Sequence, residues 1–342
     1  MSCHQFNPAL TRRDMLRASA GGFGSLALSA MAGRAAAASA SPVQIPHFKP
    51  RAKRVIFLFM WGGPSHVDLF DPKPRLNQDN GKQLHGKDVD SDRDKLGPLL
   101  GSPFKFAQHG QSGMEISELT PHLAQHADKL CMVRSMHTEG SAHGEALLRL
   151  HTGQANLVRP SVGAWVSYGL GSESENLPAF ITISPPRGHG GVQNYGNAFL
   201  PAMHQATAIG SAETPIAQAS IPNLTNARLK HDLQRSQLDL IQSLNRKHLQ
   251  QAKVDPGIEG LIGSYELAFK MQSEMPQIMS IGDESKKTLD LYGVNAGAAD
   301  NLARKCLMAR KFAERGVRYI QVSTDYTWDH HKKAKEGSVK EC

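Results

Sequence analysis

Four short apolar runs, separated by segments with helical periodicity, constrain the fold of this chain more than any other feature. The runs lie at residues 54–60, 130–136, 178–183 and 317–322. Strands that are apolar at nearly every position are typical of a parallel sheet covered on both faces. Helices are predicted between them, at residues 117–128, 142–151, 161–170, 226–253, 258–273, 284–292 and 298–315. The alternation predicts an α/β fold with a mostly parallel sheet.

The first forty residues are typical of an export signal. Arg12 and Arg13 precede a weakly apolar stretch at residues 18–32, and the small residues at 35–40 suit cleavage by a signal peptidase. Paired arginines direct such a signal to the twin-arginine route. The stretch is too short and too glycine-rich for a membrane span, which needs roughly 20 apolar residues. The predicted parts are a signal peptide, a linker and one domain, at residues 1–38, 39–52 and 53–342.

This organisation predicts where the protein works and what it meets on the way. The twin-arginine translocase is the expected partner during export, and the mature protein is expected in the periplasm or outside the cell. No stable membrane span is expected in the mature chain.

Charge and cysteine content exclude several classes of protein. The net charge of +8 falls to about +5 once residues 1–38 are removed, and the charges are dispersed, so no nucleic-acid partner is predicted. Cys131, Cys306 and Cys342 remain after the signal, and their spacing fits neither a disulfide framework nor a zinc ribbon. Cys131 lies in an apolar run and is expected to be buried. The 16 histidines, several of them clustered, are where chemistry is expected.

Two polar clusters that follow apolar runs contain candidate metal ligands. His66 and Asp68 come after residues 54–60, and Asp329 and His331 come after residues 317–322. Reactive groups of parallel sheets gather beyond the carboxyl ends of the strands, and imidazoles with carboxylates bind divalent cations. The alternatives are a turn or helix cap for Asp68 and a solvated polar loop for the second pair.

A third cluster, after residues 130–136, contains the candidate nucleophiles Ser141 and His143. Ser141 directly precedes a predicted helix that stops at Gly153, and His143 lies in the first turn of that helix. The N-terminus of a helix presents unpaired N–H groups and the positive end of its dipole, which suits an anionic ester. The alternative for Ser141 is an ordinary helix cap. The three clusters together predict one site at the edge of the sheet.

Several motifs resemble those of a known family. They are Gly-Gly-Pro-Ser-His-Val-Asp at 62–68, Phe-Asp-Pro-Lys-Pro at 70–74, His-Thr-Gly at 151–153, Asn-Tyr-Gly-Asn-Ala-Phe-Leu-Pro at 194–201 and Trp-Asp-His-His at 328–331. They are similar to domain-of-unknown-function family 1501, which groups secreted bacterial proteins often labelled sulfatase-like within the alkaline phosphatase superfamily. The resemblance spans nearly the whole mature chain.

The resemblance implies an alkaline-phosphatase-like three-layer α/β/α sandwich that binds one or two divalent metal ions, with Zn, Ca, Mg or Mn as candidates. The family's Asp-x-His pair matches Asp329 and His331, while His66 and Asp68 are further candidate ligands. The superfamily's nucleophile position falls within residues 138–143, where nothing matches the sulfatase Cys-Pro-Ser-Arg pattern. His143 stands at the nucleophile position when the helix ends are aligned.

The resemblance also implies that the chain is shorter than its relatives. Family members continue through further conserved segments beyond this point, so the chain resembles a C-terminally truncated member whose sandwich is incomplete at that end. Missing strands would leave part of the sheet uncovered and the metal site short of ligands.

The sequence is therefore compatible with two alternative functions. The first is an exported metal-dependent hydrolase-like protein of the sulfatase or phosphatase type, acting on anionic sulfate or phosphate esters or inactive because it is truncated. The alternative is a non-catalytic exported binding or assembly protein that retains the fold. Since the usual sulfatase nucleophile is absent, the sequence leaves both open.

Overall fold

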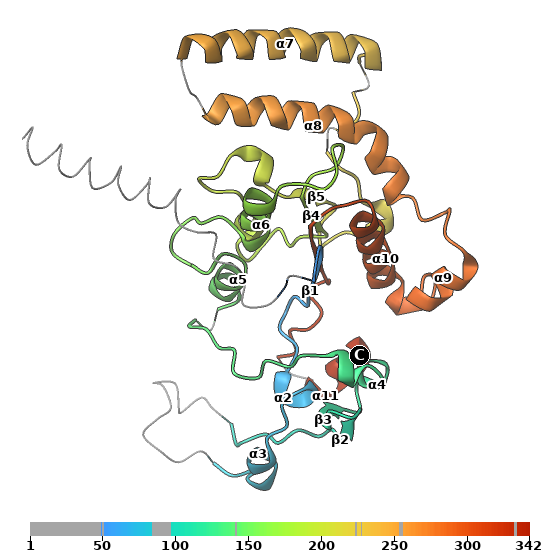
Figure 1. Cartoon of the computed structure of the whole chain (residues 1–342). Coiled ribbons are helices and arrows are strands. Elements are labelled where there is room, and N and C mark those ends of the chain that lie inside the picture. The colour runs from blue at the N-terminus through green and yellow to red at the C-terminus, as the bar shows by residue number, and fades with distance from the viewer. Residues whose placement is uncertain are drawn as a thin grey trace, which may run out of the picture. The chain divides into compact units, whose positions relative to one another are not determined.

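The computed structural model of the chain divides into two compact units, Met1–Lys53 and Arg54–Cys342, and the second contains all the elements below (Figure 1). The described residues are 49, 51–83, 97–140, 142–222, 224–226, 228–252, 256–331 and 334–342. The predicted signal peptide and the candidate nucleophile Ser141 lie outside them. Within these ranges, no helix has both the length and the apolar composition that a bilayer span requires.

A four-stranded parallel sheet organises the larger unit. It consists of β1 (Val55–Phe59), β4 (Phe180–Ile183), β5 (Thr207–Ile209) and β6 (Tyr319–Ser323), in the order β1-β6-β4-β5. Each neighbouring pair is parallel, which confirms the predicted α/β class and mostly parallel sheet. β6 is buried at every position because it lies between two strands, whereas β1 is at an edge and exposes Ile56 and Leu58.

Alternate residues of the strands face two different layers of helices. On one face, Ile183 and Ile320 join a core built with α8 (Pro256–Met279) and α10 (Asp300–Glu314). The buried side chains that these helices contribute are Met271, Met275, Ile278, Met308, Ala309 and Phe312. On the other face, Phe180 packs with Tyr319 and with Val166 of α6 (Val162–Leu170).

Helix ends follow the capping residues in the sequence. Ser161 caps α6 by accepting the backbone N–H of Ala164 over 3.4 Å. α5 (His143–Thr152) ends at Gly153, whose positive φ of 75° suits glycine. Both helices were predicted within two residues. Two short α-helices follow β1, namely α2 (His66–Leu69) and α3 (Pro74–Gln78). The connecting segments also contain short 3-10 helices, namely η3 (Gly191–Tyr195), η4 (Ala202–His204), η5 (Ile216–Gln218) and η6 (Gly297–Ala299).

A long helical hairpin precedes the last strand. α7 (His231–Ala252) lies beside α8, and Gln242 donates its side-chain amide to the carbonyl of Ile262 over 2.8 Å. Arg235 pairs with Glu266 at 2.9 Å across the same two helices. α9 (Lys286–Tyr292) follows, and α11 (Ala334–Glu341) comes after β6. The helices predicted at 226–253, 258–273, 284–292 and 298–315 are therefore confirmed as helices, with somewhat different bounds.

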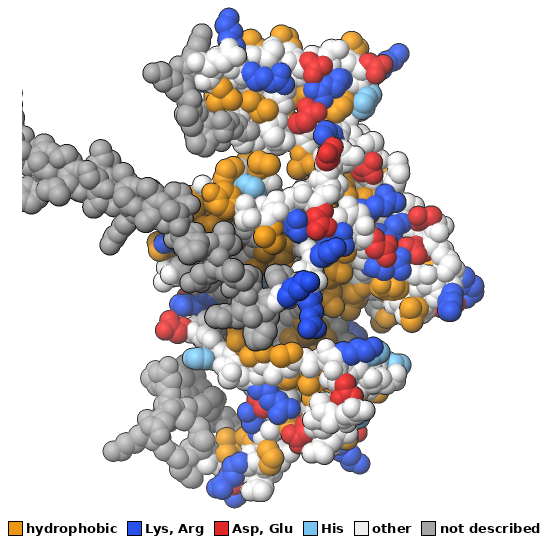
Figure 2. All heavy atoms as spheres, in the orientation of Figure 1, with side chains coloured by type: hydrophobic (Ala, Val, Ile, Leu, Met, Phe, Trp, Pro, Cys, Tyr) orange, Lys and Arg blue, Asp and Glu red, His pale blue; other side chains and the backbone are white. Residues whose placement is uncertain are grey.

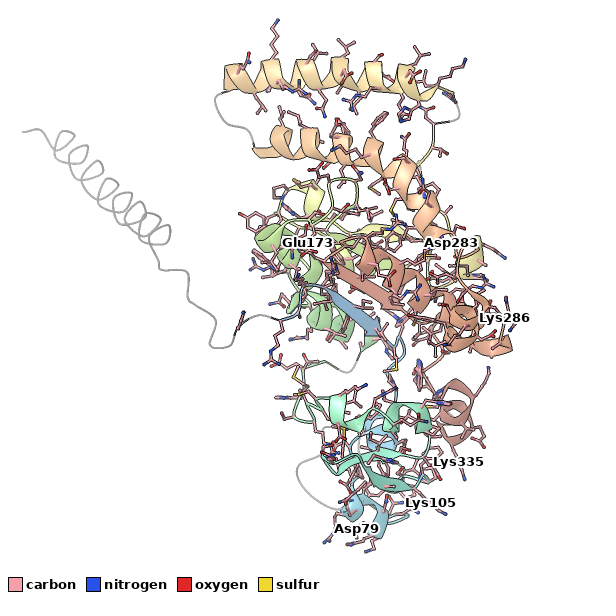
Figure 3. All side chains as sticks on the ribbon, turned by 45° about the vertical axis from the view of Figure 1, so that its right-hand side comes forward. Asp79, Lys105, Glu173, Asp283, Lys286 and Lys335 are labelled. Atoms are coloured by element: carbon pink, nitrogen blue, oxygen red, sulfur yellow. The ribbon has the colours of Figure 1, made fainter. Side chains whose placement is uncertain are left out.

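Ion pairs hold the amino ends of the two adjacent strands β1 and β6. Glu173, labelled in Figure 3, pairs with Arg54 at 2.7 Å and with Arg318 at 3.1 Å. Each arginine directly precedes its strand. Glu173 therefore links the two strands at the end opposite to the site described below.

The segment before α5 differs from its prediction. β2 (Phe106–His109) and β3 (Met114–Ser117) form an antiparallel hairpin, and only α4 (Pro121–Ala124) and η2 (Ala127–Lys129) are helical where one helix was predicted. Asp128 closes the hairpin by accepting the backbone N–H groups of Gln111 and Ser112. The described residues 130–136 form no strand, and Cys131 is exposed, so both expectations were wrong.

Candidate metal centre

The candidate site lies where the adjacent strands β1 and β6 end. The backbone N–H of Trp61, just after β1, donates to Thr324 Oγ1 over 2.9 Å. In return, the N–H of Thr324, just after β6, donates to the carbonyl of Phe59 over 3.0 Å. These bonds join segments 263 residues apart in sequence at the carboxyl edge of the sheet, where parallel α/β folds place their ligands.

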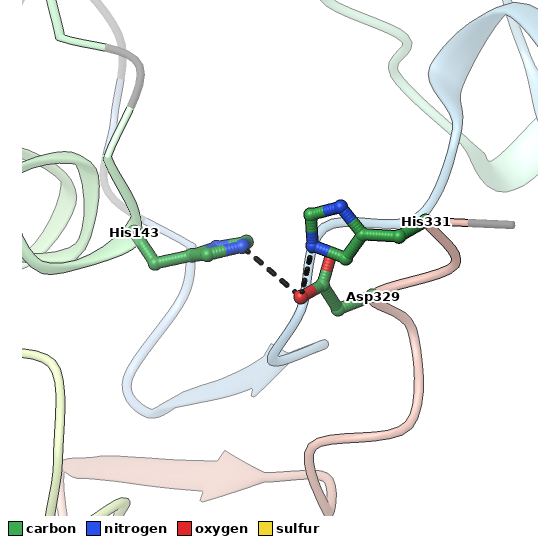
Figure 4. Close-up of side chains that lie close together, drawn as sticks. All are labelled: His143, Asp329 and His331. Carbon is green, nitrogen blue, oxygen red and sulfur yellow. Dashed lines mark hydrogen bonds and ion pairs between the residues drawn. The ribbon is translucent and has the colours of Figure 1, made fainter.

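Three side chains converge at this edge, as Figure 4 shows. The Nε2 atom of His331 lies 2.9 Å from Oδ2 of Asp329, and Nε2 of His143 lies 3.4 Å from the same oxygen. One ligand atom from each residue lies within 4.8 Å of the other two. His143 begins α5, whereas Asp329 and His331 belong to the loop after β6. Two imidazoles and a carboxylate are the protein ligands of many catalytic zinc sites.

Asp329 is held in its charged form by its neighbours. The hydroxyl of Tyr326 donates to Oδ2 of Asp329, and this bond lowers the pKa of the carboxyl. Burial acts in the opposite direction, while His331 and His143 add to the lowering. The same bond raises the pKa of Tyr326 to about 12. A carboxylate, and not a carboxylic acid, is therefore available to a cation at neutral pH.

Two other predicted site residues, His66 and Asp68, do not join this group. His66 is exposed at the start of α2 and Asp68 is half-buried in the same short helix. Within the described residues, neither belongs to the group of ligand atoms formed by His143, Asp329 and His331. Asp71 nearby is engaged with Lys73 at 2.7 Å, and that hydrogen bond lowers the pKa of Asp71.

Comparison with known proteins identifies the family. The family described as "Protein of unknown function (DUF1501)" matches residues 52–342, which include both strands and all three converging side chains. The chain belongs to the DUF1501 family. No curated protein and no solved structure matches it.

In this DUF1501 chain, the rings of His189 and Tyr326 contact His143, and Trp61 packs on both of them. None of the three was predicted. The ring of His189 stacks on that of His143 with centroids 5.4 Å apart and an interplanar angle of 26°. Tyr326 lies at 5.4 Å from His189, and Trp61 at 4.6 Å from Tyr326. The sequence offered one signal for His189, because glycines flank it at 188, 190 and 191. Such a run lets the backbone approach other groups closely.

A buried lysine supports the DUF1501 loop that carries Asp329. Lys305 of α10 is 1% exposed, and its ammonium donates to the Ser323 carbonyl over 3.0 Å and to Asp325 over 2.8 Å. Asn301 donates to both carboxylate oxygens of Asp325. The start of the loop is thus fixed to α10 by charged and neutral hydrogen bonds.

Proposed function

We propose that this protein is an exported metal-dependent hydrolase of phosphate or sulfate esters, built on an alkaline-phosphatase-like α/β/α sandwich. The observation that carries the proposal is the convergence of His143, Asp329 and His331 within 4.8 Å at the carboxyl edge of a parallel sheet. Helices on both faces of the sheet agree with the sandwich. The twin-arginine signal predicted at residues 1–38 supports export.

The three ligand atoms fit one divalent cation. Donors at about 2.0–2.2 Å from a tetrahedral ion lie about 3.3–3.6 Å from one another. Nε2 of His143, at 3.4 Å from Oδ2 of Asp329, already lies in that range, whereas Nε2 of His331, at 2.9 Å from the same oxygen, would move slightly away from it when a cation binds. Imidazole donors favour Zn²⁺ over Ca²⁺, Mg²⁺ and Mn²⁺, which prefer oxygen ligands. Three protein ligands leave a fourth position open for water or an ester oxygen.

The protein's own groups have distinct roles in this proposal. A bound cation supplies Lewis acidity at the ester oxygen. His143 and His331 would hold it through Nε2, Asp329 would balance its charge, and Tyr326 orients that carboxylate through its hydroxyl. His143 therefore takes a ligand's role in place of the nucleophile's role expected from sequence. At the start of α5, Ala142 provides no side-chain cap, so first-turn N–H groups suit an anionic ester.

Calorimetric titration of the purified full chain with Zn²⁺ and Mn²⁺ tests the metal site. Asp329→Asn and His331→Gln should each weaken binding by about 100-fold or more, because a ligand is lost. Hydrolysis of an aryl phosphate or aryl sulfate should disappear in the same variants. His66→Gln and Asp68→Asn are matched controls, since both residues lie outside the group. Equal affinity in all four variants would reject the site.

Export is tested separately. Arg12→Lys with Arg13→Lys keeps the charge but removes the twin-arginine pair. We expect the variant to stay in the cytoplasm, as measured by fractionation, while the unchanged chain reaches the periplasm. Unchanged export of the double variant would reject the route without affecting the metal site.

A second candidate, a binding or assembly protein, is favoured by one surface of α7. Leu233, Leu240 and Leu244 are 59%, 61% and 59% exposed, and their spacing places them on one face of the helix. In Figure 2, hydrophobic side chains lie among charged ones over this helix. If cellular function survives Asp329→Ala and His331→Ala but is lost when the three leucines become glutamine, this candidate replaces the hydrolase.

A further inference from the structure

His189 is held in an unusual backbone conformation beside the cluster of His143, Asp329 and His331. Its φ is +50°, in the left-handed region that costs most side-chain-bearing residues about 1–3 kcal/mol. The fully buried side chain of Asn194 donates to the carbonyl of His189 over 3.0 Å. The surrounding loop thus maintains a conformation that an unsupported loop would avoid.

The imidazole of His189 is fixed by Trp61. The indole Nε1 donates to Nδ1 of His189 over 3.1 Å. An indole nitrogen can only donate, so Nδ1 of His189 must carry a lone pair, and the proton of the neutral ring is on Nε2. Trp61 is itself 6% exposed and bonded through its backbone to Thr324. The tautomer is therefore set by a residue that the fold holds in place.

The ring of His189 lies against the proposed metal site without belonging to it. It stacks on His143, one of the three converging side chains, and meets the ring of Tyr326 at 5.4 Å. A metal ligand needs a free ring lone pair, but Nδ1 accepts from Trp61 and Nε2 carries the proton. In this state His189 is a hydrogen-bond donor and not a fourth ligand.

We infer that His189 donates its Nε2–H to a non-bridging oxygen of a tetrahedral anion, phosphate or sulfate, bound at the cluster of His143, Asp329 and His331. This inference rests on the proposed function. A cation can satisfy only part of the charge on such an anion, and an oriented neutral N–H donor stabilises the rest. Because Trp61 fixes the ring of His189 and Asn194 holds its backbone, the residue loses little freedom on binding. His189 is half-buried, so it retains access to solvent and ligand.

The test measures binding of inorganic phosphate and inorganic sulfate to the full chain, with and without Zn²⁺ or Mn²⁺, by calorimetry. His189→Phe keeps a ring to stack on His143 but has no N–H, so phosphate affinity should fall about 10-fold or more. Cation affinity should stay within about 2-fold. Trp61→Phe should produce a smaller loss of phosphate affinity, because the ring remains but its tautomer is released. His189→Gln should recover part of the affinity, because its amide donates.

The outcomes separate the inference from the proposed function. Loss of cation affinity in His189→Phe would make His189 a ligand, and unchanged phosphate and sulfate affinity would make it a packing residue. Either result overturns the inference, as does a wild-type chain that binds a cation but neither anion. If the wild type takes up no cation, the proposed function fails. If phosphate binds without a cation and its affinity still falls in His189→Phe, the hydrogen-bond donor role of His189 is supported although the metal-dependent function is not.

Discussion

A side chain at Gly62 would collide with the backbone of Asp329. A Cβ atom there would lie 2.6 Å from the Asp329 nitrogen and 2.9 Å from the carbonyl carbon of Trp328. Gly62 also has a φ of +110°, which favours glycine. The turn after β1 and the loop after β6 can therefore approach this closely only with glycine at this position.

Gly62→Ala should displace Asp329 and weaken divalent-cation binding by about 10-fold or more, because ligand geometry tolerates small shifts poorly. It should also lower the free energy of unfolding by about 1–3 kcal/mol through backbone strain alone. Gly63→Ala is the matched control: φ is +81°, but no atom lies within 4 Å of its Cβ. Calorimetry and chemical unfolding should show strain in both variants and loss of cation affinity only in Gly62→Ala.

His151 should make the fold sensitive to acid. Its side chain is 3% exposed and packs against Phe59, with the ring centroids 4.9 Å apart. This burial lowers the pKa of His151 from 6.5 to about 4. The unfolded chain therefore binds the proton more tightly, so stability falls as pH falls below 6.5 and the loss is complete below about 4. The shift corresponds to about 3 kcal/mol.

His151→Phe should remove this part of the pH dependence while keeping an aromatic ring against Phe57 and Phe59. Chemical unfolding should show that, as the pH falls from 7.5 to 4, the free energy of unfolding decreases by about 3 kcal/mol more in the wild type than in the variant. His122→Gln, at an exposed position of α4, is the control and should follow the wild type. Parallel curves for wild type and His151→Phe would contradict the prediction.

Local signals in the sequence predicted the elements that depend on local chemistry. The helix predicted at 161–170 differs from α6 by one residue, and the stop at Gly153 correctly ended α5. The hairpin of β2 and β3 was missed because its turn is closed by Asp128, whose carboxylate comes from beyond the second strand. The apolar residues 130–136 were predicted as a strand, yet Val133 is 57% and Met136 78% exposed. Apolar composition alone does not specify pairing.

In the candidate site too, local sequence signals predicted some residues, while others depend on tertiary contacts. Asp329 and His331 were singled out because they follow a buried strand, where parallel sheets place reactive groups. His143 was singled out as a candidate nucleophile at a helix start, although the strand predicted before it, at residues 130–136, does not form. His189 could not be found in this way. It reaches the cluster through a glycine-rich loop with a left-handed residue, and a contact with Trp61 across 128 positions fixes its ring. Those are tertiary relationships that no local pattern encodes.

Removing Asp325 should destabilise the protein more than removing Lys305. Lys305 is 1% exposed, whereas the side chain of Asp325 is 41% exposed. Asp325→Ala would leave a buried ammonium without its counter-charge, at a cost of about 3–5 kcal/mol. Lys305→Met would leave a carboxylate that water can solvate, so the loss should stay below about 2 kcal/mol. Denaturant unfolding of both variants measures the difference, and equal losses would contradict it.

Two glycines in α6 should respond in opposite directions to alanine. Glycine in a helix interior costs about 1 kcal/mol relative to alanine, so Gly169→Ala, with no atom within 4 Å of its Cβ, should stabilise the protein by up to that amount. A Cβ at Gly163 would lie 2.6 Å or less from atoms of the buried Phe180 ring on β4. Overpacking of this kind costs about 1–3 kcal/mol and exceeds the helical gain. Thermal unfolding should therefore show a higher midpoint for Gly169→Ala and a lower one for Gly163→Ala. If both variants were stabilised, α6 would not pack on β4 as closely as the contact between Gly163 and Phe180 requires.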